Sequence, residues 1–221
     1  MSAAAALLDR LGRPGVMRLG APAFVPQLRL ATGLPALDAA LEGGLPRGRM
    51  TELVGVRSAG RTGLACRIAA SATRAGEVIA WVDPEDALDP EAMATAGVTL
   101  ARTLWVRPRD VADALRAAEI LLGAGGFGLV VIDLGTASAA RATTWIRLAR
   151  AAERTRSTLL VLAATRSAGS CTALVLELAG RRVRWSGGGS VLLDGISARL
   201  TIARSRGGGA GRTLVLRQAC A

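Results

Sequence analysis

The apolar positions of the chain fall into short continuous runs, with longer segments of helical spacing between them. The runs predict buried β-strands at residues 50–54, 78–82, 103–106, 129–132 and 158–163. The segments predict helices at residues 34–41, 62–74, 90–96, 110–122 and 140–152, the first of which stops at Gly43 and Gly44. Strands that alternate with helices indicate βαβ units around a buried parallel sheet.

The pattern changes after residue 170. Short strand runs at residues 173–178, 183–185, 198–203 and 213–216 are separated by glycine triplets at 187–189 and 207–209, which are typical of hairpin turns. We therefore expect an α/β fold whose mainly parallel, twisted sheet is flanked by helices and ends in antiparallel strands or hairpins. Three parts are expected: a proline-containing N-terminal helix and extended arm at 1–30, a core at 31–170, and a basic, β-rich part of the same domain at 171–221.

Composition limits the class of protein. The chain is 51% hydrophobic and 20% charged, which is enough apolar material for a sizeable core. No stretch reaches the roughly 18 consecutive apolar residues of a transmembrane helix. The N-terminus lacks the basic start of a signal peptide, so we expect a cytoplasmic protein with no membrane partner.

Missing residue types exclude several kinds of catalysis. The chain has no His, which rules out His-based acid–base catalysis, Ser-His-Asp triads and His-ligated metals. Its three cysteines, Cys66, Cys171 and Cys220, are far apart, and we expect reduced structural thiols rather than a zinc site or disulfides. All 28 basic residues are Arg, a bias that GC-rich codon usage produces.

The positive charge is concentrated in the C-terminal part. Residues 134–221 contain 14 Arg against Glu153, Glu177 and Asp194, which accounts for the whole net charge of +11, whereas residues 1–133 are neutral. Such one-sided charge favours a polyanion such as DNA, or an acidic protein surface, as the partner. Solubility of an Arg-rich chain is the alternative. The aromatic residues expected in single-strand binders are scarce.

A glycine-punctuated segment at residues 55–62 is the strongest local signal for a binding site. It follows a predicted strand and opens a predicted helix, which is the context of a phosphate-binding loop. In such a loop, consecutive backbone N–H groups and the helix N-terminus surround phosphate oxygens. The candidate nucleotide-binding residues are Gly55, Ser58, Gly60, Arg61 and Thr62, of which Gly60 permits the backbone geometry and Thr62 offers a hydroxyl to Mg²⁺.

The position that such a loop gives to lysine holds Arg61. The lysine ammonium is compact and reaches the β- and γ-phosphates, whereas a guanidinium is larger, planar and differently directed. Drift from Lys to Arg is expected in a chain without Lys, but an enzyme that relies on the ammonium should keep it. We therefore expect weak or absent ATP turnover. The bland alternative for the segment is a tight turn between a strand and a helix.

Two carboxylates that follow predicted strands complete the candidate site. Asp133 ends an apolar strand, as a Mg²⁺-orienting carboxylate does in phosphate-loop proteins, although an Asp at this position is also a frequent helix N-cap. Glu85 follows the strand at 78–82 and is a candidate base for an attacking water. Its alternative is a solvated acidic turn.

Taken in order along the chain, these segments resemble the core of bacterial RecA. The resemblance covers about residues 30–218 and is carried by residues 32–49, 55–64 at the Walker A position, 81–90, 130–133 at the Walker B position, 158–162 and 202–206. It implies that Glu85 stands at the position of the catalytic glutamate and Thr165 at that of a nucleotide-sensing glutamine. It also implies that Arg204 and Arg206 stand where basic side chains reach the neighbouring subunit's nucleotide.

Departures from RecA imply lost activities. The two RecA loops that bind single-stranded DNA follow Walker B and the sensing strand; here the first looks deleted after Asp133 and the second truncated after Arg166. We therefore expect no strand exchange. Together with Arg61, this pattern is similar to the ImuA family, the RecA-like component of a bacterial damage-induced (SOS) mutagenesis cassette. That family acts beside ImuB, a degenerate Y-family polymerase relative, and an error-prone DnaE-type polymerase.

The first hypothesis for function is a RecA-like accessory protein of SOS translesion DNA synthesis. It would lack ATPase activity, need no cofactor, and act through contacts with RecA and an ImuB-type polymerase homologue. Arg61, Asp133 and Glu85 would form a charge cluster in the phosphate site, because a buried carboxylate needs a partner. The residues assigned to a protein interface or to DNA are Phe24, Arg181, Arg182, Arg184, Arg204 and Arg206.

The second hypothesis is an active RecA-fold ATPase or recombinase paralogue that uses ATP and Mg²⁺. Its machinery would be Arg61 in the lysine role, Glu85 as the catalytic base, Thr62 and Asp133 as Mg²⁺ ligands, and Arg204 and Arg206 across an interface. A third hypothesis is a DNA-binding module without enzymology, in which the basic C-terminal part contacts phosphates.

Overall fold

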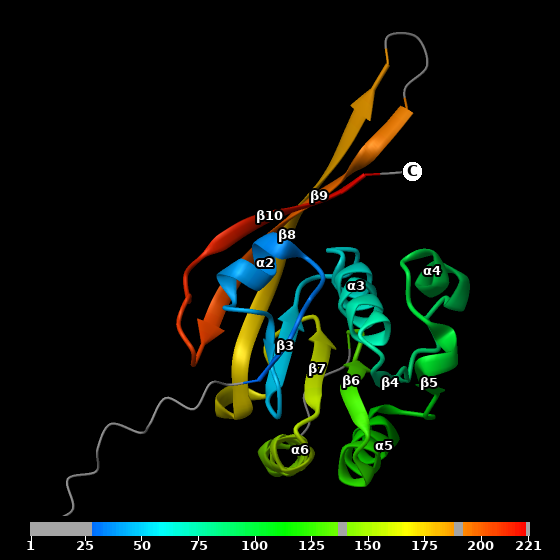
Figure 1. Ribbon diagram of the computed structural model, residues 1–221, viewed down its shortest axis with the longest axis vertical. Helices are drawn as coiled ribbons and strands as arrows, with labels where there is room; N and C mark the ends of the chain where they lie inside the picture. Colours follow the sequence, from blue (N-terminus) through cyan, green and yellow to red (C-terminus); the bar gives the residue numbers. More distant parts are fainter. Residues whose placement is uncertain (1–27, 137–140, 188–191, 220–221) are drawn as a thin grey trace, which may run out of the picture.

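The structure, a computed structural model, describes residues 28–136, 141–187 and 192–219. Its centre is an eight-stranded sheet with the strand order β10-β9-β8-β3-β7-β6-β4-β5 (Figure 1). Neighbouring strands from β8 to β5 pair in parallel, whereas β9 pairs antiparallel with both β8 and β10. The expected α/β fold, with a mainly parallel sheet and an antiparallel C-terminal end, is therefore confirmed.

The predicted strands and helices of the parallel part occur within a few residues of their expected positions. The strands of the large sheet are β3 (Met50–Val54), β4 (Val78–Val82), β5 (Thr103–Val106), β6 (Phe127–Asp133), β7 (Thr158–Ala163), β8 (Thr172–Ser186), β9 (Leu192–Ser205) and β10 (Thr213–Ala219). The α-helices are α2 (Pro35–Ala40), α3 (Arg61–Arg74), α4 (Pro90–Thr95), α5 (Val111–Ala124) and α6 (Ala142–Thr155). Among the residues described, none of these helices is long and apolar enough to cross a membrane.

Helices cover both faces of the parallel strands, so successive strand residues enter different cores. Ile79 and Trp81 of β4 join one core with residues of α2, α3 and α4. Ala80 and Val82 of the same strand join the other core with residues of α5 and α6. All four side chains are fully buried. For this reason the strands read in the sequence as continuous apolar runs instead of an alternating pattern.

The C-terminal strands are longer than predicted. The runs expected at 173–178 and 183–185 are one strand, β8, which passes through Gly180 with a positive φ of 64° and shifts its register against β9. The run expected at 198–203 is the inner part of β9. Apolar runs mark only the buried parts of these strands, because the hydrogen bonds of a ladder need no apolar side chain. The turn expected at 207–209 lies between β9 and β10 as predicted.

A small two-stranded sheet precedes the core and was not predicted. It pairs β1 (Arg29–Leu30) with β2 (Leu45–Pro46), and strands this short carry no readable periodicity. Asp38 of α2 fastens the chain next to it, because its Oδ1 accepts hydrogen bonds from the Thr32 N–H at 2.7 Å and the Thr32 hydroxyl at 2.8 Å. A helix and an extended arm were expected at residues 1–30. Residues 1–27 of this segment lie outside the described part of the chain.

Candidate functional site

The predicted phosphate loop connects β3 to α3 at the carboxyl edge of the sheet. Ser58 and Gly60 have positive φ values of 64° and 98°, which turn the chain into the helix. Gly55 lies against β8, where an added Cβ would approach the Leu178 carbonyl oxygen to 2.8 Å, so a larger residue does not fit. No side-chain hydrogen bond caps the N-terminus of α3 within the described residues, so its first N–H groups lack a side-chain acceptor and suit an anion. The backbone here fits a bound phosphate group.

Arg61, at the lysine position of this loop, turns toward the end of β6. Its guanidinium Nη1 donates a hydrogen bond to the Gly135 carbonyl oxygen at 2.9 Å. Only 9% of the residue is exposed, which is unusual for an arginine. The side chain that would grip a triphosphate is therefore held by the protein's own backbone.

The predicted carboxylates gather beside this guanidinium. Asp133 ends β6, and its Oδ1 accepts a hydrogen bond from the Gly135 N–H at 3.0 Å. Glu85 follows β4, and its Oε1 accepts from the Thr136 N–H at 3.4 Å. The structure thus brings Arg61, Asp133 and Glu85 together around residues 135 and 136. In the described part of the chain they meet through these backbone groups, and no direct ion pair joins them.

The environment of Asp133 disfavours its charge. Burial raises the pKa of the Asp133 carboxyl above its usual value, and the neighbouring Asp83 and Glu85 add to the rise. The hydrogen bond from Gly135 and the positive charge of Arg61 oppose it. The hydrogen bond from Gly135 and the charge of Arg61 therefore both favour the ionised form of Asp133.

The nearby thiol is inert. Burial first, and the charge of Asp133 second, raise the pKa of Cys66 on α3 to about 11. A thiol with this pKa stays protonated at neutral pH and is a poor nucleophile. Cys66 and Cys171 are both free cysteines, in agreement with the expected reduced thiols, and Cys220 lies outside the described residues.

The residues present fit part of a nucleotide and Mg²⁺ site. Thr62 is exposed at the start of α3, and its hydroxyl and the Asp133 carboxylate are oxygen ligands that suit Mg²⁺. The N–H groups of the loop suit one phosphate group. The guanidinium of Arg61 is hydrogen-bonded to Gly135, so in this position it does not contact the terminal phosphates of a nucleotide. The geometry therefore does not support a hydrolytic step. Among the described residues, no group of three metal-binding side chains is placed to hold an ion.

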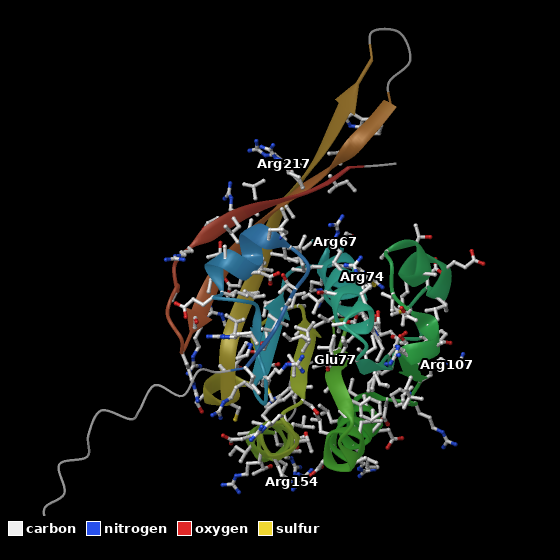
Figure 2. The ribbon with its side chains drawn as sticks, viewed as in Figure 1. Arg67, Arg74, Glu77, Arg107, Arg154 and Arg217 are labelled. Atoms are coloured by element: carbon white, nitrogen blue, oxygen red, sulfur yellow. The ribbon has the colours of Figure 1, made fainter. Side chains whose placement is uncertain are left out.

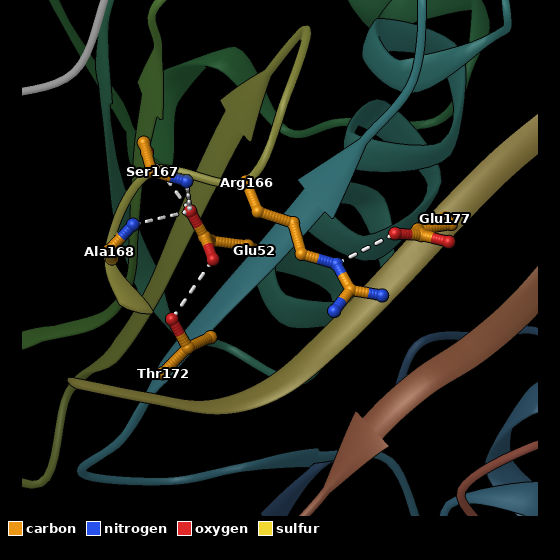
Figure 3. Close-up of polar contacts among 6 residues, drawn as sticks. All are labelled: Glu52, Arg166, Ser167, Ala168, Thr172 and Glu177. Atoms are coloured by element: carbon orange, nitrogen blue, oxygen red, sulfur yellow. Dashed lines mark hydrogen bonds and ion pairs between the residues drawn. The ribbon is translucent and has the colours of Figure 1, made fainter. Parts of the chain in front are cut away.

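A buried carboxylate that the sequence analysis did not single out holds the connection between β7 and β8 (Figure 3). Glu52, in the middle of β3, is 1% exposed. Its Oε1 accepts from the Ser167 N–H at 2.7 Å, the Ser167 hydroxyl at 3.0 Å and the Ala168 N–H at 2.9 Å. Its Oε2 accepts from the Thr172 hydroxyl at 3.0 Å. The sequence offered one sign of this role, an acid inside the apolar run at 50–54. A buried carboxylate needs hydrogen-bond donors around it.

The same connection begins at the predicted sensor position. Thr165 follows β7, and the next residue, Arg166, forms an ion pair with Glu177 of β8, with its Nε 2.7 Å from Oε1 (Figure 3). The connection takes only the eight residues between Ala163 and Thr172. The segment after Arg166 is therefore short, because β8 begins at Thr172.

Two arginines that were predicted to reach a neighbouring subunit also contact this connection. Arg204 Nη1 donates a hydrogen bond to the Gly169 carbonyl oxygen at 2.7 Å, and Arg206 Nη2 donates to the Ser170 carbonyl oxygen. Both arginines lie on or next to the end of β9. In this structure their side chains support their own chain.

The remaining predicted interface residues are only partly described. Arg182 is exposed on β8. Arg181 and Arg184 belong to the same strand, and Phe24 lies outside the described residues.

An apolar pocket of about 240 Å³ adjoins the phosphate loop. It lies between α3 and the antiparallel strands and is lined by Leu34, Ala59, Gly60, Gly63, Leu64, Arg67, Leu178, Ile196, Ala198, Leu216 and Arg217. Sequence analysis did not predict it, because it needs the pairing of strands that are far apart in the chain.

Comparison with known proteins assigns the class. The RecA N-terminal domain family matches residues 1–166, and the chain belongs to this family. Its relatives include the protein RecA of Clavibacter michiganensis subsp. michiganensis, 42% identical over 144 residues that cover 64% of this chain and 40% of that protein. The protein RecA of Acidothermus cellulolyticus is 43% identical over 132 residues, which cover 59% of this chain and 38% of that protein. The chain thus spans about two fifths of the length of these relatives.

A solved structure agrees with the fold. The crystal structure of the RadB recombinase superposes with a TM-score of 0.65 over 85% of this chain and 95% of that one, at 21% sequence identity. At this identity the likeness shows the fold alone. The RecA-like core implied by the sequence is therefore confirmed.

We predict that Arg61→Gln destabilises the protein in a pH-dependent way. Loss of the cation should raise the pKa of Asp133 further. A carboxyl whose folded pKa is raised binds protons more readily in the folded state, so its contribution to stability is lost as the pH rises. Urea titrations should therefore show a larger loss of unfolding free energy near pH 8 than near pH 4. The loss of unfolding free energy at high pH should be smaller in Arg61→Gln/Asp133→Asn, which has no carboxyl at position 133. An equal loss at both pH values, in the single and in the double variant, would contradict the role of the Arg61 charge.

We also predict that Glu52→Ala lowers the free energy of unfolding by about 3 kcal/mol or more, because several buried donors lose a charged acceptor. The free energy of unfolding of Glu52→Gln should lie between those of the natural sequence and Glu52→Ala, because glutamine keeps one acceptor oxygen. Urea titration measures the change. The control is Glu42→Ala, whose side chain is 66% exposed and should change stability by no more than about 0.5 kcal/mol. Equal effects of Glu52→Ala and Glu42→Ala would show that the connection does not depend on Glu52.

Proposed function

We propose that this protein is a RecA-like accessory protein of damage-induced translesion DNA synthesis, of the kind represented by the ImuA family. In this role it lacks ATPase and strand-exchange activity and acts through contacts with RecA and an ImuB-type polymerase homologue. Membership of the RecA N-terminal domain family supports a role in DNA repair. The step from that family to the accessory role rests on the candidate site.

The observation that carries the proposal is the position of Arg61. A phosphate-loop ATPase stabilises the charge on the transferred phosphoryl group with a mobile lysine ammonium and Mg²⁺. Here the residue at that position is an arginine, 9% exposed, that donates to the Gly135 carbonyl oxygen. Moving it toward a phosphate would break this hydrogen bond and would remove the cation that opposes the raised pKa of Asp133. The site is therefore better suited to stability than to turnover.

The two short connections support the absence of strand exchange. Eight residues separate Asp133 from α6, and eight separate β7 from β8. The second connection is fixed by Glu52 and by the Arg166–Glu177 ion pair. A segment that is this short and this firmly bonded offers little chain for wrapping a DNA strand.

Contacts with other proteins are supported by the open edge of the sheet. β5 is the last strand in the sheet order, so one side of its backbone has no neighbouring strand of the described chain. Leu104 on this strand and Leu100 just before it are 44% and 43% exposed. An edge with exposed apolar side chains is suited to adding a strand from a partner.

The active ATPase is the second candidate, and one observation favours it. Thr62, Asp133 and Glu85, which the sequence places in separate segments, meet at the same edge of the sheet as an active site would require. This candidate needs Arg61 to leave Gly135 when a nucleotide binds.

Calorimetric titration with ATP and Mg²⁺ separates the two candidates. We expect no saturable binding at micromolar concentrations for the natural sequence, and at least about tenfold tighter binding for Arg61→Lys, since an ammonium restores the phosphate contact. Micromolar binding by the natural sequence, with phosphate release that disappears in Glu85→Gln, would establish the ATPase and overturn the proposal.

The partner contacts are tested by pull-down of purified RecA and of a purified ImuB-type homologue. We expect both to be retained to the same extent with and without ATP, because binding does not depend on nucleotide. Arg61→Gln should retain them equally. Failure to retain either protein would refute the accessory role, and retention that requires ATP would favour the ATPase.

A further inference from the structure

A β-hairpin arm projects from the edge of the sheet that carries the phosphate loop. β8 runs parallel to β3, whose last residue, Val54, pairs with Glu177, and β8 then continues to Ser186. β9 returns alongside it, with Ser186 paired to Leu192. Figure 1 shows the two strands extending beyond the layers of helices, from the side where α3 begins. We call residues 178–187 and 192–200 the arm.

The face of the arm toward α3 is apolar along its length. Leu178 and Ile196 line the pocket beside α3, and Val183 pairs with Ile196, so it continues the same face. Trp185 follows two residues later on β8 and shares the side of Val183. These last two side chains are 42% and 60% exposed. An apolar surface thus extends from the protein interior along the arm to the exposed Trp185. A large exposed apolar side chain that continues such a surface is a sign of an interaction site.

The wall opposite the arm is open. The pocket reaches α3 at Gly60 and Gly63, and an added Cβ at either glycine would meet no atom within 4 Å. The pocket volume of about 240 Å³ is smaller than the roughly 300–1,000 Å³ of typical small-molecule sites. It fits one or two apolar side chains that enter from outside.

Arginines stand on both sides of this opening. Arg67 of α3 and Arg217 of β10 both line the pocket, and Figure 2 labels Arg67 on α3 and Arg217 beside the projecting strands. Arg182 and Arg199 are also exposed on the arm, and the strand pairing places them on the face opposite Val183 and Ile196. Residues 134–221 hold 14 arginines against three acids, and this charge favours a partner that carries negative charge.

We propose that this surface, which we call the arm groove, binds an acidic amphipathic segment of a partner protein. Apolar side chains of the segment enter the pocket and pack on Val183 and Trp185, while its carboxylates face Arg67 and Arg217. Tryptophan and arginine around an apolar centre are the residue types that dominate the energy of protein interfaces. The inference deepens the proposed function by naming a surface and a partner chemistry for its protein contacts.

A protein segment suits the groove better than a nucleic acid. The pocket walls between the two arginines are aliphatic or glycine, and these give nothing to a phosphodiester backbone. Single-strand binders stack successive bases on several aromatic side chains. Trp185 is the one aromatic residue of the arm, and the pocket lining has none. A segment with leucine-like and acidic side chains satisfies both halves of the surface.

The test uses synthetic peptides, so it does not depend on RecA or an ImuB-type protein. A fluorescein-labelled peptide of about 18 residues carries Leu and Glu on opposite faces of a helix, and a matched peptide carries Lys in place of each Glu. Fluorescence anisotropy should show binding of the Glu peptide. Arg67→Glu/Arg217→Glu should weaken it at least about tenfold and should bind the Lys peptide better than the natural sequence does. The charge-matched control, Arg109→Glu/Arg150→Glu, alters exposed arginines away from the groove and should stay within about threefold.

The apolar half is tested separately. Trp185→Ala should weaken binding of the Glu peptide at least about tenfold. The circular dichroism spectrum of this variant should match that of the natural sequence. Because Trp81 and Trp145 are fully buried and Trp105 lies on β5, at the end of the strand order away from the arm, binding should also shift the fluorescence that Trp185→Phe removes. Equal binding by the groove variants and the control, or no binding of the Glu peptide, would overturn the inference. So would binding of single-stranded DNA that needs Arg67, Arg217 and Trp185 while the peptide does not bind. These outcomes leave the pull-down of RecA and the ImuB-type homologue as an independent test of the proposed function.

Discussion

The carboxylate of Glu52 is the interaction on which the arrangement of the molecule depends. β7 and β8 flank β3 on either side and both run parallel to it, so the chain must return from the end of β7 and cross β3. Parallel connections commonly use a dozen or more residues, and this one uses eight. Such a short crossing leaves buried N–H groups without a ladder partner, and Glu52 accepts them at the centre of the sheet. The start of β8, and with it the direction of the arm, follows from this contact.

The phosphate site shows how one cation can change the use of a fold. The loop backbone keeps the shape that suits an anion, and the carboxylates keep their places at the strand ends. Arg61 converts the space between them into an internal contact, because a guanidinium is long enough to reach the Gly135 carbonyl from the helix N-terminus. Burial and the neighbouring acids raise the pKa of Asp133, and the positive charge of Arg61 is one of two influences that lower it. This hydrogen bond ties the phosphate loop to the end of β6.

Two arginines at the end of β9 also make contacts within the chain. Arg204 and Arg206 reach the carbonyl oxygens of residues 169 and 170 of their own connection. Exposed apolar side chains lie on the arm, at Val183 and Trp185, and on the edge strand β5, at Leu104.

The sequence alone determined the class of fold, the parallel strands and the phosphate loop. Strands such as β4 and β7 are buried on both faces, and the left-handed turn at Gly60 leaves a local glycine signal, so each is legible within a few residues. Only the tertiary structure decided the partners of Glu52 and Arg61, because their hydrogen bonds join residues separated by 115 and 74 positions. The length of β8 and the pocket beside α3 were likewise beyond a local pattern. Strand pairing and burial depend on which distant segments meet, and that choice is made by the packing of the whole chain.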